Sequence, residues 1–251
     1  MLNFRRRRQA RDDRPPPSIG QDVRVYAIGD IHGRLDLFEQ LLQAIDQDSG
    51  ERRPLRTELI LLGDLVDRGP SSAQMIDRAM GLATSGSVHF IKGNHEEVFA
   101  AAARGDVRSA GFLRRIGGVE TLASYGLDAD RSAAMDDGAL ARWMLTHVPR
   151  EHVDFVSGFK DMLTIGDYLF VHAGIRPRVP LEAQDPADLR WIRGDFLMYR
   201  GDHGRVVIHG HSITPQIDEQ ANRIGIDTGA WRSGTLTAIG LEGSERWFLQ
   251  T

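Results

Sequence analysis

The sequence predicts an α/β fold in which two packed, mixed sheets are flanked by helices. Three times, an apolar run of strand type ends in a glycine-bounded polar motif and is followed by a segment with helical periodicity. This order is typical of βαβ units, whose parallel strands place their polar loops at one edge of the sheet. From residue 162 onward, short apolar runs with glycine-containing connections predict a second, meander-rich half.

The first half of the chain contains three predicted strand–helix pairs. Residues 23–28 alternate before turning apolar, as a strand that enters a sheet does. Leu35, Phe38 and Leu42 then recur at the spacing of one helix face. The predicted strands are residues 23–28, 59–62 and 88–91, and the predicted helices are residues 35–45, 71–82 and 96–103.

A helical insertion is predicted around residues 96–160, because this stretch is rich in alanine and poor in β-branched runs. Gly117, Gly118 and Gly126 punctuate it. We expect the insertion to lie over or beside the functional site. Six further strands are predicted beyond it, at residues 162–165, 168–171, 206–208, 223–226, 236–239 and 246–249.

The composition is that of an ordinary globular protein, and residues 23–251 are predicted to form one domain. Hydrophobic residues make up 41% of the 251 residues and charged residues 26%. The absence of cysteine excludes disulfides and thiolate metal sites, so a metal would need oxygen and nitrogen ligands, which suit Mn, Mg, Fe or Zn. No run approaches the roughly 18 apolar residues that a membrane span needs.

Residues 1–22 are predicted to be a disordered, basic and proline-rich tail. Residues 1–14 contain six arginines and two aspartates, which gives them a charge of +4. Because the net charge of the whole chain is −4, residues 15–251 carry a charge of −8. The stretch lacks apolar periodicity, and no apolar segment follows the arginines as in a signal peptide. We expect a solubilising tail, and attraction to nucleic acid or anionic lipid is the alternative.

Side chains of the kinds that bind metals follow several predicted strands and adjoin glycines. They lie in the motifs GDIHG, GDLVDRG and GNHE and at two later histidines, and they are Asp30, His32, Asp64, Asn94, His172 and His211. Asp30 and His32 are two residues apart and share a face, so they could offer oxygen and nitrogen to one ion. Asp64 could bridge two ions. The positive charge of two divalent ions would exceed the negative charge of Asp30, Asp64 and one hydroxide, so the centre would remain cationic. The pattern therefore predicts a two-metal hydrolytic site.

The motif order GDIHG, GDLVDRG, GNHE, VHAG and GH resembles that of the calcineurin-like metallophosphoesterases, in their phosphoprotein phosphatase branch. The match covers about residues 23–240. Two further motifs, WIR at Trp191–Arg193 and IDTGA at Ile226–Ala230, are similar to those of the bacterial and phage members of the family, including phage lambda phosphatase. The resemblance implies a four-layer αββα sandwich with a helical insertion around residues 96–160.

The same resemblance implies two bound divalent ions, with Mn expected before Fe or Zn. Asp30, His32 and Asp64 would hold one ion. The ligands of the other would be Asp64, Asn94, His172 and His211. A water between the ions would become hydroxide and attack phosphorus in line, with no phosphoenzyme.

Four further residues are expected to handle the substrate. His95 would protonate the leaving oxygen, oriented by Asp67, a contribution of roughly 10²–10⁴ in rate. Arg68 and Arg193 would clamp phosphate oxygens, because a planar guanidinium matches them bidentately. Asn94 is expected to contact the substrate as well as the metal.

Several other polar and aromatic residues are expected to be structural. His209 is expected to support the fold or the site, because the resemblance places the ligand after Gly210. Asp227 ends a strand near the site and is as readily a ligand-orienting residue as a structural one. Packing, and not stacking of bases, is expected of Trp143, Trp191 and Trp231.

Three functions remain open from the sequence. The favoured one is a protein phosphatase acting on phosphoserine or phosphothreonine, with phosphotyrosine not excluded. The alternative is a symmetrical diadenosine tetraphosphate hydrolase. A non-catalytic phosphate-binding regulator is disfavoured, because no ligand and no acid is missing. Glu96 favours the phosphatase, because the dinucleotide hydrolases typically carry GNHD in place of GNHE.

The expected setting is the cytoplasm of a bacterium. The expected partner is a phosphorylated protein or a small phosphoester, with neither membrane nor nucleic acid involved, and the oligomeric state is open.

Overall fold

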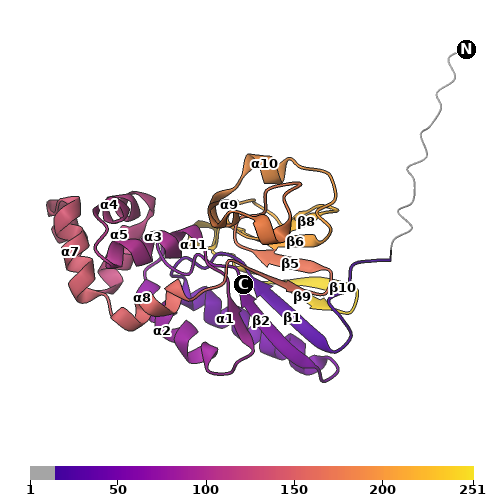
Figure 1. Ribbon diagram of the computed structural model, residues 1–251. Helices are drawn as coiled ribbons and strands as arrows, with labels where there is room; N and C mark the ends of the chain where they lie inside the picture. Colours follow the sequence, from indigo (N-terminus) through magenta and orange to yellow (C-terminus); the bar gives the residue numbers. More distant parts are fainter. Residues whose placement is uncertain (1–14) are drawn as a thin grey trace, which may run out of the picture.

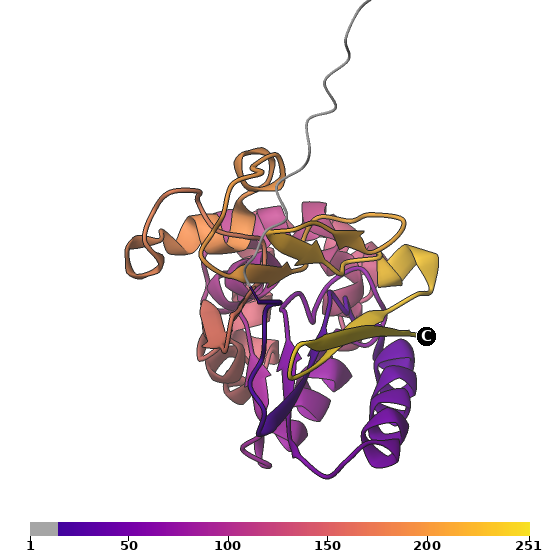
Figure 2. The same ribbon diagram turned by 90° about the vertical axis from the view of Figure 1, so that its right-hand side faces the viewer.

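The computed structural model describes residues 15–251 as two stacked five-stranded sheets with helices on their outer faces (Figure 1). Residues 1–14, most of the predicted tail, lie outside the described residues. Figure 2 shows the two sheets as separate layers, with helices below the first and beside the second. The predicted four-layer αββα architecture is confirmed.

The first sheet has the order β10-β9-β1-β2-β3. Its parallel part consists of β1 (Val23–Ile28), β2 (Arg56–Leu61) and β3 (Val88–Phe90). β9 (Thr237–Glu242) pairs antiparallel with β1, and β10 (Glu245–Gln250) pairs antiparallel with β9. The last two strands of the chain therefore complete the sheet that the first strands begin.

The second sheet has the order β4-β5-β6-β8-β7. Its strands are β4 (Met162–Ile165), β5 (Tyr168–Val171), β6 (Val206–His209), β7 (Asp218–Glu219) and β8 (Arg223–Gly225). The expectation of a meander was wrong for its centre, since β5, β6 and β8 are parallel. Helices α9 (Pro186–Trp191) and α10 (Gly194–Leu197) lie in the crossover from β5 to β6, which allows this parallel pairing.

Alternating strand residues divide the interior into three apolar layers. In β5, Phe170 faces the core between the sheets, where Val25 and Ile60 also lie, whereas Leu169 faces α9 and α10. Tyr26 of β1 faces the outer helices of the first sheet instead. Because side chains alternate along a strand, each sheet covers one face with helices and the other with its partner sheet.

The helices of the first half cover the outer face of the first sheet or form a lobe beside it (Figure 1). Helices α1 (Leu35–Glu51) and α2 (Ser72–Ala83) pack on the sheet. The predicted helical insertion comprises α3 (Asn94–Ala103), α4 (Val107–Ile116), α5 (Gly118–Ser124), α6 (Ala129–Ala134), α7 (Asp137–His147) and α8 (Arg150–Ser157). No helix within residues 15–251 is long and apolar enough to cross a membrane.

The described end of the predicted tail contacts the sandwich before residue 23. The backbone N–H of Ser18 donates to Asp167 Oδ2 at 2.9 Å, and that of Ile19 donates to the carbonyl of Gly243 at 2.8 Å. Ile19 is 2% exposed and belongs to the core between the sheets. The buried side chain of Ile19 and the backbone hydrogen bonds of Ser18 and Ile19 therefore hold residues that the composition assigned to a disordered tail.

Candidate active site

The six predicted metal ligands converge at one edge of the sandwich, where strands of both sheets end. Asp30 and His32 follow β1, and Asp64 follows β2. The remaining three come after β3, β5 and β6 and are Asn94, His172 and His211. All six are buried, with exposed fractions of 6% or less. Two parallel sheet segments thus deliver their carboxyl-end side chains to a common point.

The backbone at this edge adopts unusual conformations. Within residues 15–251, six non-glycine residues have positive φ, and five of them belong to the predicted site: His32, Asp64, Asp67, Arg68 and His211. Left-handed backbone costs free energy for such residues, and it persists where surrounding contacts hold it. The close approach also requires glycine, since a Cβ at Gly210 would overlap Asp30 Oδ1 and one at Gly93 would overlap Asp64 Oδ1.

Asp64 lies at the centre of the converging side chains. Its Oδ2 is 3.4 Å from His172 Nε2, 3.7 Å from His32 Nε2 and 3.8 Å from His95 Nε2. Burial raises the pKa of this carboxyl group, but the surrounding histidines outweigh burial and hold the pKa below its ordinary value. Asp64 is therefore an ionised carboxylate that several imidazole nitrogens face.

One group of donors around Asp64 fits a metal ion by its hydrogen-bond chemistry. The ligand atoms of Asp64, His172 and His211 lie within 4.8 Å of one another. His172 Nδ1 is 2.8 Å from the carbonyl of Leu62, which can only accept, so Nδ1 carries the proton. Burial lowers the pKa of His172, which leaves Nε2 as a bare lone pair. That lone pair faces Asn94 Oδ1 at 3.0 Å and His211 Nδ1 at 3.2 Å, an assembly of acceptors that a cation satisfies.

The second group contains His32, Asp64 and His95, whose ligand atoms also lie within 4.8 Å of one another. His32 Nδ1 lies 2.8 Å from the carbonyl of Val66, so its Nε2 is likewise an acceptor. In this structure Arg68 donates to that Nε2 at 2.8 Å. A metal at His32 would therefore compete with the guanidinium for the same lone pair.

Asp30 stands beside this group and does not join it. Its two oxygens accept from the backbone N–H of His211, both at 3.1 Å. Burial and the nearby carboxylates of Asp227 and Asp64 raise the pKa of Asp30. Crowding of buried carboxylates is relieved by a cation, and so the role of Asp30 as a ligand stays a prediction.

His95 and Asp67 form a hydrogen-bonded pair of the kind expected for an acid and its orienting carboxylate. His95 Nδ1 lies 2.6 Å from Asp67 Oδ2, and its Nε2 accepts from Arg68 at 3.0 Å. Burial opposes charging of His95, but Asp64 and the bond to Asp67 outweigh it and raise the His95 pKa. Because Nδ1 is bonded to Asp67, a proton that the imidazole gains would be carried on Nε2, in place of the hydrogen bond that Nε2 accepts from Arg68 in this structure.

Two residues behind this pair escaped sequence reasoning. The hydroxyl of Thr121, in α5, donates to Asp67 Oδ1 at 2.6 Å. Its oxygen also accepts from the backbone N–H of Asp67 at 2.9 Å, as does Ser72 Oγ at 3.0 Å. No motif marks either residue. The docking of α5 brings Thr121 to the GDLVDRG loop, and Ser72 reaches Asp67 from the start of α2.

The two predicted phosphate clamps occupy different parts of the site. Arg68 is half-buried, and its backbone N–H donates to the carbonyl of Gly117 at 2.7 Å, which ties it to the insertion. Arg193 is exposed just after α9, and its charge lowers the pKa values of His172 and His211 beyond the effect of burial. The structure therefore places one guanidinium near each group of ligands.

Glu96 binds the backbone of two site loops. Its carboxylate accepts from the backbone N–H groups of Asp64 at 2.8 Å, Leu65 at 2.7 Å and Gly93 at 2.9 Å. It thereby fastens the GDLVDRG loop to the GNHE loop. Because all of these bonds are to backbone, the contacts of Glu96 give no support to a protein substrate over a nucleotide.

His209 and Asp227 also have defined places. His209 is buried against Phe196, with ring centroids 5.0 Å apart, and it lies in neither group of metal-type ligands, as expected. Asp227 accepts from the backbone N–H of Gly229 at 2.9 Å and lies beside Asp30.

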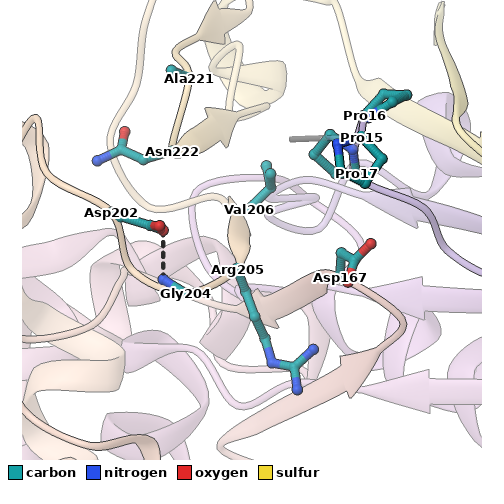
Figure 3. Close-up of a pocket in the computed structure, with 10 residues that line it drawn as sticks. All are labelled: Pro15, Pro16, Pro17, Asp167, Asp202, Gly204, Arg205, Val206, Ala221 and Asn222. Atoms are coloured by element: carbon teal, nitrogen blue, oxygen red, sulfur yellow. Dashed lines mark hydrogen bonds between the residues drawn. The ribbon is translucent and has the colours of Figure 1, made fainter. Parts of the chain in front are cut away.

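A separate hollow has a volume of about 390 Å³, and Figure 3 shows the residues that line it. Pro15–Pro17, Asp167 and Arg205 are among the residues around it. It adjoins the starts of β5 and β6, whereas His172 and His211 follow the ends of these strands. The hollow is therefore at the opposite edge of the sheet and is not part of the site.

Known proteins resemble this chain over most of its length. A family model described as calcineurin-like phosphoesterase matches residues 23–229. The symmetrical bis(5'-nucleosyl)-tetraphosphatase of Acidovorax sp. strain JS42 is 34% identical over 178 residues, which are 71% of this chain and 49% of that protein. The chain thus spans about half the length of this relative. The asymmetrical bis(5'-nucleosyl)-tetraphosphatase PrpE of Bacillus subtilis strain 168 is 26% identical, over 84% of this chain and 88% of that protein.

Solved structures share the fold at low sequence identity. A protein provisionally described as a diadenosine tetraphosphatase superposes with a TM-score of 0.63 and 20% identity, over 92% of this chain and 98% of that one. A cold-active protein tyrosine phosphatase gives a TM-score of 0.54 and 18% identity, over 92% of this chain and 81% of that one. At these identities the likeness shows the fold alone.

Proposed function

This chain belongs to the calcineurin-like phosphoesterase family, and we propose that it hydrolyses dinucleoside tetraphosphates symmetrically, with two divalent metal ions. The substrate class is supported by the relatives, since proteins named symmetrical bis(5'-nucleosyl)-tetraphosphatase reach 34% identity. The sequence favoured a protein phosphatase through Glu96, and that support is lost because Glu96 binds backbone. The alternative function weighed from the sequence becomes the proposal.

The observation that carries the reaction type is the sharing of Asp64 by two groups of metal-type ligands. Asn94, His172 and His211 would complete one ion's ligands. In the second group, His32 would bind the other ion together with Asp30, which stands beside the group, and His95 would be kept for the proton. Carboxylate, imidazole and amide donors suit Mn, with Fe or Zn as alternatives. Bound there, the ions supply Lewis-acid chemistry that polarises the phosphoryl oxygens and lowers the pKa of water.

The protein's own groups handle the proton and the charge. His95, with its raised pKa and its bond to Asp67, donates a proton from Nε2 to the departing oxygen. The leaving group of a tetraphosphate is a nucleoside diphosphate, which needs less help from an acid than an alkoxide does. Arg68 and Arg193 orient the phosphate chain through charge-assisted hydrogen bonds.

Product analysis tests the proposal. The protein is incubated with Mn²⁺ and diadenosine tetraphosphate, and in parallel with a phosphoserine peptide and a phosphotyrosine peptide. Symmetrical cleavage gives two molecules of ADP, whereas asymmetrical cleavage gives ATP and AMP. We expect ADP alone, at a kcat/KM well above that for either peptide. Release of phosphate from a peptide with no cleavage of the dinucleotide would return the assignment to a protein phosphatase.

The proposed setting is the cytoplasm of a bacterium, where nucleotide substrates occur, and the proposed partner is the small phosphate substrate itself.

A further inference from the structure

Two half-exposed tryptophans stand at the rim of the site, one beside each group of metal-type ligands. Trp191, at the end of α9, and Trp231, in α11 (Ala230–Ser233), are each 37% exposed. Both were expected to be packing residues, which Trp143 is, with 7% exposure. Among residues 15–251 the other exposed large hydrophobic side chains are aliphatic: Val107, Leu145 and Met198.

Trp191 is held firmly while its surface stays open. Its ring lies 6.5 Å from that of His211 and 6.0 Å from that of Phe112, and its Nε1 donates to Glu97 Oε2 at 3.0 Å. A ring fixed at several points loses little freedom when a ligand stacks on it.

A hollow of about 420 Å³ adjoins this ring and is lined in part by Arg193 and Asp195. Arg193 can bind a phosphate there. Asp195 pairs with Arg176 at 3.1 Å but remains 68% exposed, so it can also accept from the hydroxyls of a ribose.

Trp231 stands beside the other group of ligands. The guanidinium carbon of Arg68 lies 5.5 Å from the centre of its ring, and that of Arg232 lies 6.0 Å away. Arg68 in turn bonds to His32 and His95. A flat aromatic surface flanked by guanidinium groups therefore adjoins each half of the site.

We propose that Trp191 and Trp231 each stack one nucleobase of a dinucleoside polyphosphate whose phosphate chain lies across the metal site. The inference rests on the proposed function and adds how the two ends of that substrate are recognised. Every base presents a π-face, and stacking on an aromatic side chain binds it with little dependence on its identity. Arg68, Arg193 and Arg232 supply positive charge to the anionic chain between the bases.

Four substitutions test the stacking. We expect Trp191→Ala and Trp231→Ala each to raise the KM for diadenosine tetraphosphate about tenfold, with a smaller change in kcat, because stacking on an aromatic ring contributes a large share of base affinity. Trp191→Phe and Trp231→Phe keep a ring and should recover most of the loss. Leu145→Ala, at a 57% exposed position on α7, is the matched control and should behave like the wild type.

Fluorescence gives a readout that does not depend on turnover. A base stacked on tryptophan quenches its emission, so ADP should quench the wild type, and pyrophosphate, which has no base, should not. The quench should diminish in Trp191→Phe and in Trp231→Phe, and remain in Leu145→Ala.

The possible outcomes separate this inference from the proposed function. If the wild type cleaves the dinucleotide and both alanine variants keep its KM, the stacking inference is overturned while the function stands. If the wild type cleaves only a phosphopeptide, the proposed function fails. In that case, loss of peptide affinity in the alanine variants together with no quench by ADP would make the tryptophans a peptide-docking surface.

Discussion

At the residue scale, Asp64 is the side chain on which both groups of metal-type ligands depend. Its Oδ2 lies within 3.8 Å of three imidazole nitrogens, and Oδ1 accepts from the backbone N–H of His95 at 3.0 Å. We expect Asp64→Asn to weaken binding of both ions, because a neutral amide removes the shared negative charge. Metal content after dialysis, measured by mass spectrometry, checks this.

Asn94→Ala serves as the comparison for that experiment, because Asn94 Oδ1 lies 3.0 Å from His172 Nε2, in the group that contains His172. The Asn94→Ala substitution should weaken the binding of one ion more than that of the other. Full occupancy by two ions in Asp64→Asn would remove this residue from the bridging position.

His95 is the residue whose replacement separates acid catalysis from metal binding. We expect His95→Asn to lower kcat roughly 10²–10⁴-fold on an alkyl phosphate, where the leaving oxygen needs a proton. The loss should be smaller on diadenosine tetraphosphate and on p-nitrophenyl phosphate, whose leaving groups are stable anions. Turnover of the three substrates, with metal content as the control, measures this. Equal losses on all three would argue against His95 as the acid.

The residues that sequence reasoning placed correctly are those whose position follows from a strand end. The ends of β1, β2, β5 and β6 bring Asp30, Asp64, His172 and His211 to one edge, and the motif spacing contains this information. The roles of Glu96 and of the two rim tryptophans do not follow from spacing. Whether a side chain points to the site, to backbone or to solvent depends on how distant segments pack, which spacing does not contain.

At the element scale, α5 is the part of the insertion that bears on the chemistry. Thr121 donates to Asp67, and Gly117 at the preceding turn accepts from the backbone N–H of Arg68. The insertion was expected to lie over or beside the site. It also holds, from behind, the carboxylate that orients His95.

Thr121→Val tests this support, because valine keeps the shape and removes the hydroxyl. Asp67 Oδ1 would lose its donor, so we expect kcat to fall about tenfold, as is typical when an outer hydrogen-bond partner is lost. The free energy of unfolding should fall by about 1–3 kcal/mol, because a buried polar group is left unpaired. Kinetics and denaturant unfolding measure the two effects.

Thr121→Ser, which keeps the hydroxyl, should retain most of the activity. Thr146→Val, on the exposed face of α7, is the control for replacing a threonine by valine. The Thr146 hydroxyl donates to the carbonyls of Arg142 and Trp143 within its own helix. An unchanged kcat in Thr121→Val would mean that Ser72 alone suffices to hold Asp67.

The elements that were predicted well have strong local signals, and the misjudged ones do not. β1 and β5 have the predicted bounds, because a run of apolar residues between turn formers defines them. β7 consists of Asp218–Glu219 and has no apolar pattern, so only its pairing with β8 makes it a strand. The second half was taken for a meander because its short connections suggested hairpins, while the crossover through α9 and α10 is irregular.

At the scale of the whole molecule, the order of strands across the sheets was beyond the sequence pattern. Continuous apolar runs such as residues 59–62 are consistent with strands covered on both faces, but they do not specify partners. The pairing of β9 with β1 brings residues 237–242 against residues 23–28. Such long-range pairing depends on the summed packing of the sandwich, and no local motif encodes it.

One polar cluster closes this arrangement by joining the first and last strands to α1. Asp48 of α1 accepts from the hydroxyl of Tyr26 at 2.5 Å, from Trp247 Nε1 at 2.9 Å and from Arg52 Nε at 3.0 Å. Burial raises the pKa of Asp48, but the hydrogen bonds from Tyr26 and Arg52 outweigh it and hold the pKa below its ordinary value. The folded state therefore binds protons at this site less readily than the unfolded chain.

That difference predicts how stability depends on pH. The stabilisation by Asp48 is fully present above the unfolded pKa of about 3.9 and is lost as the pH falls through the lower folded value. Asp48→Asn should therefore cost about 2 kcal/mol at pH 7, as for loss of hydrogen bonds to a charged group. The gap between variant and wild type should begin to narrow below about pH 4, because the unfolded wild type then binds a proton at Asp48 more readily than the folded protein does. Asp46→Asn, an exposed position on the same helix, should leave stability unchanged at both pH values. Denaturant unfolding of the three proteins at pH 7 and near pH 3.5 measures their free energies of unfolding. If the difference between Asp48→Asn and the wild type stays constant with pH, the packing around Asp48 matters and its charge does not.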